Sequence, residues 1–149
     1  MLDVTLAELP DHKGADLGHS QWVFVDQPRI DAFADATEDR QWIHVDQARA
    51  SDGPFGSTIA HGYLTLSLVS VFLFDLLAVR GASSIVNYGL NRVRFPAPVP
   101  SDSRIRGLGT LVEVQEVGAS MQTTTRVTIE REGGSRPVCV ADVLTRFDA

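Results

Sequence analysis

Asp39 and His44 are the residues whose types and spacing best suit acid–base chemistry. They lie five positions apart in the stretch 38–44, which has no consistent helical or strand period, so we expect a loop there. On a regular helix this spacing would put the two side chains on different faces. In a turning loop a carboxylate can orient an imidazole, or the two can share a water. From spacing alone, two solvated loop residues are the simpler interpretation.

Four other polar residues are candidates for binding, each with an ordinary structural alternative. His61 precedes a long apolar run and could line a pocket, or could bond to backbone at the start of a helix. Asn87 lies among apolar neighbours on an expected strand, where a buried amide needs partners, so we favour a structural network. Arg92 and Arg94 alternate on one strand face and could meet phosphate groups or simply face solvent.

The longest apolar run, 63–79, is the element around which the other segments must be organised. Its 17 residues form a helix of roughly 25 Å if they are all helical. Apolar side chains occur on nearly every face, which indicates a helix surrounded by protein or by lipid. A spanning helix needs about 20 apolar residues, and this shorter run is interrupted by Asp75 and three hydroxyl residues. We therefore predict a buried central helix.

The remaining segments are mostly strand-like. After a polar lead-in over 1–19, a short strand at 22–25 precedes a helix that Asp26 caps and that frays by Thr37. Asp46 is expected to cap one more turn of helix. Strands are then predicted at 84–95, 104–117, 120–130 and 136–147, in meander order. The expected class is α+β, a hot-dog arrangement in which an antiparallel sheet wraps around the long central helix, with a helical excursion before it.

Composition narrows the possible partners and the location. The 149 residues suit one domain, 1–149, and a net charge of −6 without a basic tract argues against nucleic acid and membrane surfaces. The N-terminus has no leader-like pattern, and the single Cys139 cannot form an internal disulfide, so we expect a cytoplasmic protein. Valines on both sides of Cys139 predict a buried strand thiol. The sequence has no cluster of His, Cys and carboxylates with ligand spacing and no phosphate loop. It therefore implies neither a metal nor a redox cofactor.

The stretch 33–44, FADATEDRQWIH, resembles the hydratase signature of the MaoC-like dehydratases, the (R)-specific enoyl-CoA hydratases. The downstream segment 54–62, PFGSTIAHG, is also similar. The detail of 39–46 and of 87–99, NYGLNRVRFPAPV, points to the nodulation protein N-like branch, which includes some mycobacterial hydratases. The resemblance extends from about Gly14 to Phe147.

This resemblance implies a function and roles for individual residues. Asp39 and His44 fall on the catalytic pair of the family, and Gln41 occupies the position of its asparagine. Gly62 matches the glycine whose backbone N–H binds the substrate thioester oxygen. The implied reaction is reversible hydration of trans-2-enoyl-CoA to (R)-3-hydroxyacyl-CoA, with no cofactor beyond the coenzyme A of the substrate. Arg94 could then meet coenzyme A phosphates, and a homodimer is expected because hot-dog domains pair edge to edge.

Two departures from the signature leave alternatives open. Trp42 replaces a proline, as is normal in this branch, whereas Glu38 replaces the glycine beside Asp39. If that glycine adopts a positive φ, Glu38 strains the loop, and its charge disfavours ionisation of its neighbour. One rival is therefore a non-catalytic acyl-binding or signalling protein. The other is a hot-dog thioesterase, whose acid usually lies on the central helix. Asp75, the only acid there, is far from the helix start.

Overall fold

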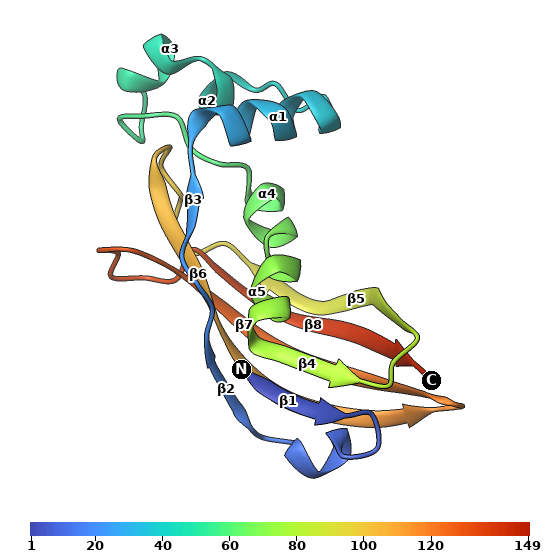
Figure 1. Ribbon diagram of the computed structural model, residues 1–149. Coiled ribbons are helices and arrows are strands. Elements are labelled where there is room, and N and C mark those ends of the chain that lie inside the picture. Colours follow the sequence, from blue (N-terminus) through green and yellow to red (C-terminus); the bar gives the residue numbers. More distant parts are fainter.

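A curved antiparallel sheet forms most of the molecule in the computed structural model, which describes all residues from Met1 to Ala149 (Figure 1). Its strands lie in the order β2–β6–β7–β8–β5, and β3 also pairs with β6. The bounds are Asp16–His19 for β2, Val23–Val25 for β3, Ser84–Arg94 for β5, Ser103–Val117 for β6, Ser120–Arg131 for β7 and Cys139–Asp148 for β8. The antiparallel sheet with segregated helices agrees with the predicted α+β class.

The predicted meander order is right for three strands and wrong for the fourth. β6, β7 and β8 follow one another as antiparallel neighbours, but β5 pairs with β8 instead of β6. Pro96, Pro98 and Pro100 lie between β5 and β6. Because proline has no N–H to donate to a ladder, this connection does not continue as a tight hairpin. It leads the chain away and leaves β5 at the open edge of the sheet.

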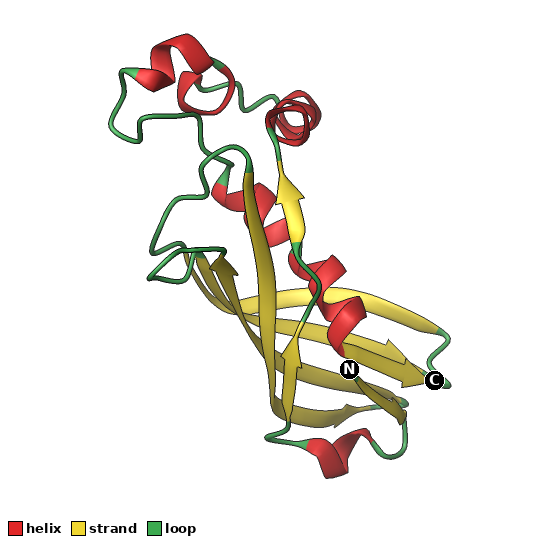
Figure 2. Cartoon of the chain, turned by 60° about the vertical axis from the view of Figure 1, so that its left-hand side comes forward, coloured by secondary structure: helices red, strands yellow, loops and turns green.

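The central helix consists of two consecutive segments, α4 (Gly62–Ser67) and α5 (Val69–Leu76), with Leu68 between them. The Leu68 N–H donates to the Leu64 carbonyl and the Phe72 N–H to the Leu68 carbonyl, each at 3.2 Å. These bonds keep the i to i−4 pattern across the junction, so side-chain positions continue in helical register. The sheet curls around this helix, as predicted (Figures 1 and 2). None of the helices is long and apolar enough to cross a membrane.

The helix ends three residues earlier than predicted. Leu77–Arg80 is a strand, β4, that pairs in parallel with β1 (Leu2–Thr5). The polar lead-in is accordingly more ordered than expected, and it also holds a 3-10 turn, η1 (Leu9–His12). Backbone partners on β1 compensate for the lost helical hydrogen bonds of 77–80, and this pairing joins segments too distant in sequence for local periodicity to reveal.

One face of the helix packs closely against the sheet. Phe72 and Leu76 are completely buried. A Cβ added at Gly107 of β6 would lie 2.8 Å from the Cβ of Phe72, too close for any side chain. A glycine at this position therefore lets the helix approach the strand, and the main hydrophobic core forms around that contact.

The opposite face of the helix is uncovered within the chain, contrary to the expectation of an all-round buried helix. Tyr63, Val71 and Phe74 are 72%, 44% and 65% exposed. The neighbouring edge strand β5 is exposed along nearly its whole length. Large apolar side chains on two adjacent elements therefore face the same open side of the molecule.

The helical excursion lies beyond one end of the sheet and comprises α1 (Gln27–Thr37), α2 (Trp42–Val45) and α3 (Gln47–Ser51) (Figure 2). The predicted caps are confirmed: the Asp26 and Asp46 carboxylates accept from backbone N–H groups three residues later, each at 3.0 Å. The stretch 38–44 was predicted as loop throughout, but its last residues form the single turn of α2. One turn carries too few apolar positions to show a period.

Candidate active site

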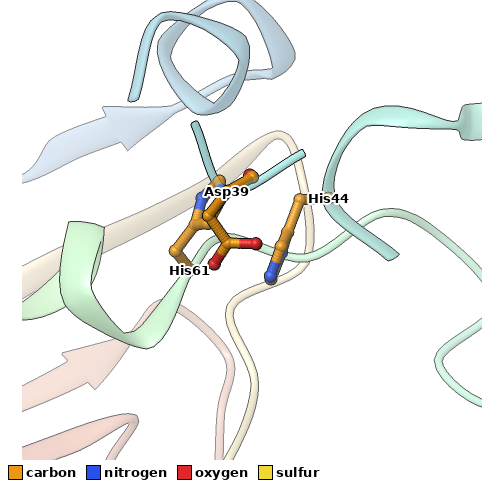
Figure 3. Close-up of side chains that lie close together, drawn as sticks. All are labelled: Asp39, His44 and His61. Carbon is orange, nitrogen blue, oxygen red and sulfur yellow. The ribbon is translucent and has the colours of Figure 1, made fainter. Parts of the chain in front are cut away.

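Three polar side chains meet where the helical excursion reaches the start of the central helix. Asp39 follows α1, His44 lies in α2, and His61 immediately precedes α4. One potential ligand atom of each lies within 4.8 Å of the others. Figure 3 shows the Asp39 carboxylate directed toward the ring of His44, with His61 beside them. The structure therefore brings together the sequence-predicted pair and adds His61 to it.

Hydrogen bonds determine the orientation and tautomer of His44. Its Nδ1 lies 2.7 Å from the Ile59 carbonyl oxygen. Because a carbonyl only accepts, Nδ1 carries the proton and Nε2 is left with a free lone pair. The backbone of His44 is held as well: its N–H donates to the Gln41 carbonyl at 2.9 Å, and its carbonyl accepts from Gln27 Nε2 at 2.8 Å. The imidazole therefore presents an acceptor nitrogen to the site.

The environment of His44 favours its neutral form. The side chain is buried, and burial lowers the pKa of His44 below its ordinary value. The hydrogen bond to Ile59 and the Asp39 carboxylate oppose this effect, while His61 adds to it. A neutral imidazole with a free Nε2 can accept a proton at neutral pH.

His61 is a second buried imidazole, and it links the other two residues. Its Nε2 donates to the backbone carbonyl of Asp39 at 2.9 Å, which fixes the tautomer. Its ring stacks on His44 with 3.8 Å between centroids, and Phe33 packs against it at 5.0 Å. The expected backbone hydrogen bond of His61 is therefore present, and its role in lining a substrate pocket stays a prediction. Its Nδ1 is buried without a partner.

The stacked geometry suits a small hydrogen-bonding molecule better than a metal ion. The planes of His44 and His61 differ by only 25° at a centroid separation of 3.8 Å. An ion bound by both imidazoles must lie close to both ring planes, at about 2.1 Å from each nitrogen. Two nearly parallel ring planes at this separation intersect too far from the imidazole nitrogens for one ion to lie close to both planes. The free imidazole nitrogens and the Asp39 carboxylate are instead three acceptors, which can receive the two O–H groups of a water.

Gly62 begins α4 directly after His61. As the first helical residue, it has an N–H without an intrahelical acceptor, at the positive end of the helix dipole. It borders a depression of about 260 Å³ that Phe55, Phe95 and Pro96 also line. A Cβ at Gly62 would lie 3.2 Å from the ring of Phe95, so glycine leaves needed space here. A carbonyl oxygen entering this depression can approach the Gly62 N–H.

The backbone of Glu38 explains why the family signature has glycine at this position. Glu38 ends α1 in the left-handed conformation, with φ 63° and ψ 10°. A side chain in this region is strained, as predicted from the departure. Gln41, which lies between Asp39 and His44, accepts a hydrogen bond from the His44 N–H with its backbone carbonyl. No hydrogen bond of the Gln41 side chain is present, so its amide role stays a prediction.

The remaining predicted residues lie on β5, away from the cluster of Asp39, His44 and His61. Asn87 is exposed and makes one long contact, 3.5 Å from Nδ2 to Ser70 Oγ. The expected buried amide network is therefore wrong, because β5 is an uncovered edge. Arg94 lies with Arg92 on the outer face of the sheet, opposite the helix, in a depression shared with Arg126 and Asp142.

Two other expectations can be compared with the structure directly. Cys139 is buried as predicted, and burial raises the pKa of its thiol to about 11, so it is not a nucleophile at neutral pH. Asp75 accepts a hydrogen bond from the Gln21 N–H at 3.0 Å, near the far end of α5. This contact gives Asp75, the only acidic residue of the central helix, a structural role far from Gly62.

Comparison with known proteins places this geometry in a family. The model of the MaoC-like domain matches residues 9–132. The chain is 47% identical over 146 residues to 3-hydroxyacyl-thioester dehydratase Z of Mycobacterium tuberculosis, covering 97% of each chain. It is 49% identical over 153 aligned positions to nodulation protein N of Rhizobium leguminosarum bv. viciae, covering 99% of this chain and 95% of the relative.

Solved structures show the same fold. A structure described as monoamine oxidase regulatory protein from Archaeoglobus fulgius superposes with a TM-score of 0.77 at 26% identity, covering 91% of this chain and 89% of that one. An unliganded R-hydratase of Pseudomonas aeruginosa has a TM-score of 0.76 at 22% identity, covering 98% and 86%.

The sheet wrapped around a helix that begins beside a carboxylate–imidazole cluster defines a hot-dog protein equipped for acid–base chemistry. The chain belongs to the MaoC-like dehydratase family. The resemblance inferred from the hydratase signature is thereby confirmed, and so is the predicted fold class.

Proposed function

We propose that this protein catalyses the reversible hydration of trans-2-enoyl-CoA to (R)-3-hydroxyacyl-CoA. The observation that carries the proposal is the meeting of the Asp39 carboxylate and the His44 imidazole beside the free N–H of Gly62. The names of the relatives support it, since they include a 3-hydroxyacyl-thioester dehydratase and, at 37% identity over 83 residues, a 3-hydroxybutyryl-CoA dehydratase from Methylorubrum extorquens.

In the proposed reaction, one water donates its O–H groups to the Asp39 carboxylate and to His44 Nε2, which leaves an oxygen lone pair free for attack. The new bond forms between this oxygen and C3 as one of the two groups removes a proton. The electrons of the double bond move toward the thioester carbonyl, whose developing negative charge the Gly62 N–H stabilises. The proton taken from the water then passes to C2 while the other group holds the new hydroxyl, which completes the addition of water and returns Asp39 and His44 to their starting protonation.

This arrangement makes the reaction stereospecific. If the water is held between Asp39 and His44 while Gly62 holds the thioester oxygen, only one face of the enoyl plane meets the nucleophile. Both the oxygen and the proton then arrive from that face, giving syn addition and a product oxygen derived from solvent. The (R) configuration follows from the family, because the distances carry no handedness.

Coenzyme A is proposed as the thioester carrier, with no cofactor besides the substrate. Arg94 and Arg92 support the choice, because guanidinium groups match phosphate geometry well. Their depression and the one at Gly62 share Pro96, so the two sites are adjacent at the end of β5. A polyanionic nucleotide outside and an acyl group inside would then occupy neighbouring sites. Gln41 and His61 are proposed to contact the thioester end of the substrate.

A homodimer is proposed as the functional unit. The open edge of β5 has unpaired backbone groups, and strand pairing with a second copy would satisfy them. Four apolar side chains of this strand are exposed: Ile85 (49%), Val86 (46%), Tyr88 (54%) and Leu90 (44%). Ile85 and Leu90 lie on the inner face of β5 beside the uncovered helix face, whereas Val86 and Tyr88 lie on the outer face with Arg146, so a partner would bury the inner pair together with the helix face. A cytoplasmic location stays a prediction.

Incubation with crotonyl-CoA tests the reaction against both rivals. Loss of the enoyl absorbance and release of free thiol are followed in parallel, and the product is offered to 3-hydroxyacyl-CoA dehydrogenases selective for each enantiomer. We expect loss of the chromophore without thiol release and oxidation by the (R)-selective enzyme. Thiol release without hydroxyacyl product would identify a thioesterase, no turnover would identify a non-catalytic protein, and oxidation by the (S)-selective enzyme alone would refute the stereochemical assignment.

A further inference from the structure

A small hollow lies between α5 and the inner face of the sheet, and five of the ten residues that line it are polar. Its volume is about 90 Å³. The apolar side chains on its walls include Leu73 and Phe147. Its polar lining consists of Ser70, Asn87, Thr123, Thr125 and Thr145. We call this hollow the threonine pocket.

Two hydroxyls of the threonine pocket are buried without hydrogen-bond partners. Thr123 and Thr145 are 0% and 5% exposed, and the Oγ1 atom of each has no partner in the protein. They are directly opposite each other on β7 and β8. A buried unpaired hydroxyl is costly, and valine would fill the same space without that cost. Farther along β7, the inner positions are in fact the apolar Val127 and Ile129.

The threonine pocket lies on the path along which a bound acyl chain would extend from the active site. Leu66, Ser70 and Leu73 follow Gly62 at spacings of four, four and three residues, so they share one helix face. Leu66 and Ser70 also line a second depression, with Asn87 and Leu90 of β5, that adjoins the threonine pocket. The rise from Gly62 to Ser70 is ~12 Å. A chain of medium length anchored at Gly62 therefore reaches the hydroxyls.

Two bulges in β5 direct its side chains toward this path. The pairing of β5 with β8 shifts register between Asn87 and Gly89 and again between Leu90 and Arg92. Bulges re-aim side chains along an edge strand. As a result Asn87 is opposite Thr145 and Leu90 is opposite Val143, both residues of the inner face. The amide of Asn87 thus adds a donor and an acceptor at the mouth of the pocket.

From these observations we infer that the protein selects acyl chains that carry an oxygen, as hydroxyl or carbonyl, on their distal part. A rotation about χ1 that turns the Thr123 and Thr145 hydroxyls toward the hollow would let them donate to such an oxygen, and a substrate hydroxyl could also donate to them. A plain hydrocarbon chain would cover the same hydroxyls and leave them unpaired. The inference rests on the proposed hydratase function, which places the thioester at Gly62.

The test compares trans-2-decenoyl-CoA with the same compound bearing a terminal hydroxyl. We expect kcat/KM for the hydroxylated substrate to be higher by about tenfold, the scale of one or two well-made hydrogen bonds. The double variant Thr123→Val, Thr145→Val should reverse the preference. The matched control is Thr124→Val, whose side chain lies on the opposite face of β7, and it should keep the preference.

Two further measurements separate failure of this inference from failure of the proposed function. Crotonyl-CoA is too short to reach the pocket, so its turnover should be the same in the double variant and the wild type. Turnover of crotonyl-CoA together with equal or better use of the plain decenoyl chain would overturn the inference alone. If no substrate is hydrated, the inference is tested by calorimetric binding of decanoyl-CoA and of its terminally hydroxylated form. Equal affinity for the two compounds would overturn the inference.

Discussion

The two ends of the central helix differ in how completely the chain itself determines them. At the start of α4, the imidazoles of His44 and His61 are each held by a backbone carbonyl and stack on each other, so the proposed catalytic groups are already in place. Along α5 and β5, apolar side chains are open, and the hydroxyls of Thr123 and Thr145 on the facing strands β7 and β8 lack partners. The proposed acid–base site is therefore preorganised within one chain, whereas the surface proposed to hold the acyl group and to pair with a second copy is left open by the chain itself.

The strongest test of this contrast compares a buried and an open position of the same helix. Leu68 is 7% exposed and Phe74 is 65% exposed. Leu68→Asp should unfold the protein, because an unpaired buried carboxylate costs several kcal/mol, a large part of a domain's stability of about 5–15 kcal/mol. Phe74→Asp should stay folded, as measured by circular dichroism and thermal melting. A cooperatively folded Leu68→Asp protein would contradict the buried-helix model.

The next largest effect is expected at the proposed catalytic pair, Asp39 and His44. Asp39→Asn and His44→Gln should each lower kcat by at least about 10², the usual contribution of a positioned acid or base. Both variants should remain folded, because Asp39 is exposed and Gln can occupy the volume of His44. Steady-state rates with crotonyl-CoA, alongside melting curves, measure this. Near-normal turnover in both folded variants would remove these residues from the mechanism.

The open side of the molecule can be tested through its oligomeric state. Wild-type protein should elute at twice the chain mass in size-exclusion chromatography with light scattering. Leu90→Arg should shift it to the monomer, because a charge would be placed in the proposed interface. Val112→Arg on β6, at a position 36% exposed and remote from β5, is the matched control and should remain dimeric. A monomeric wild type would refute the edge pairing.

A smaller effect is expected at the strained residue beside the catalytic aspartate. Glu38→Gly should raise the free energy of unfolding by about 1 kcal/mol, because glycine adopts the left-handed conformation without penalty. Activity should be kept or raised. Glu38→Ala removes the charge but retains the strain, so it separates the two causes. If Glu38→Gly lost tenfold or more in kcat/KM at unchanged stability, Glu38 would have a catalytic role of its own.

The pH dependence gives the finest test of the preorganised end. The pKa of His44 is lowered by burial, so the folded protein binds this proton less readily than the unfolded chain does. Its contribution to stability is therefore fully present above about pH 6.5, the ordinary value, and is lost as the pH falls toward the folded pKa. Activity that needs neutral His44 should persist below pH 6.5. Stability is measured by chemical denaturation and activity by kcat/KM, each as a function of pH, in the wild type and in His44→Gln. A wild-type activity that already falls with acid above pH 6.5 would contradict the lowered pKa of His44.

Local features of the fold were predictable because their causes are local. The caps at Asp26 and Asp46 depend on a side chain and an N–H three residues away. Strand composition and glycine turns indicated β6, β7 and β8, and the longest apolar run indicated the central helix. The hydratase signature identified Asp39 and His44, and it marked Glu38 as a departure whose positive φ the structure then showed.

What only the tertiary structure decided are contacts between segments distant in sequence. The pairing of β5 with β8 and of β1 with β4 depends on backbone partners up to some 75 residues away, which no period in either segment encodes. The stacking of His61 on His44 arises in the same way, because the start of α4 meets α2 only in the folded chain. The sequence by itself determined which residues could do chemistry. Long-range packing decided which of them stand together and which part of the molecule remains open.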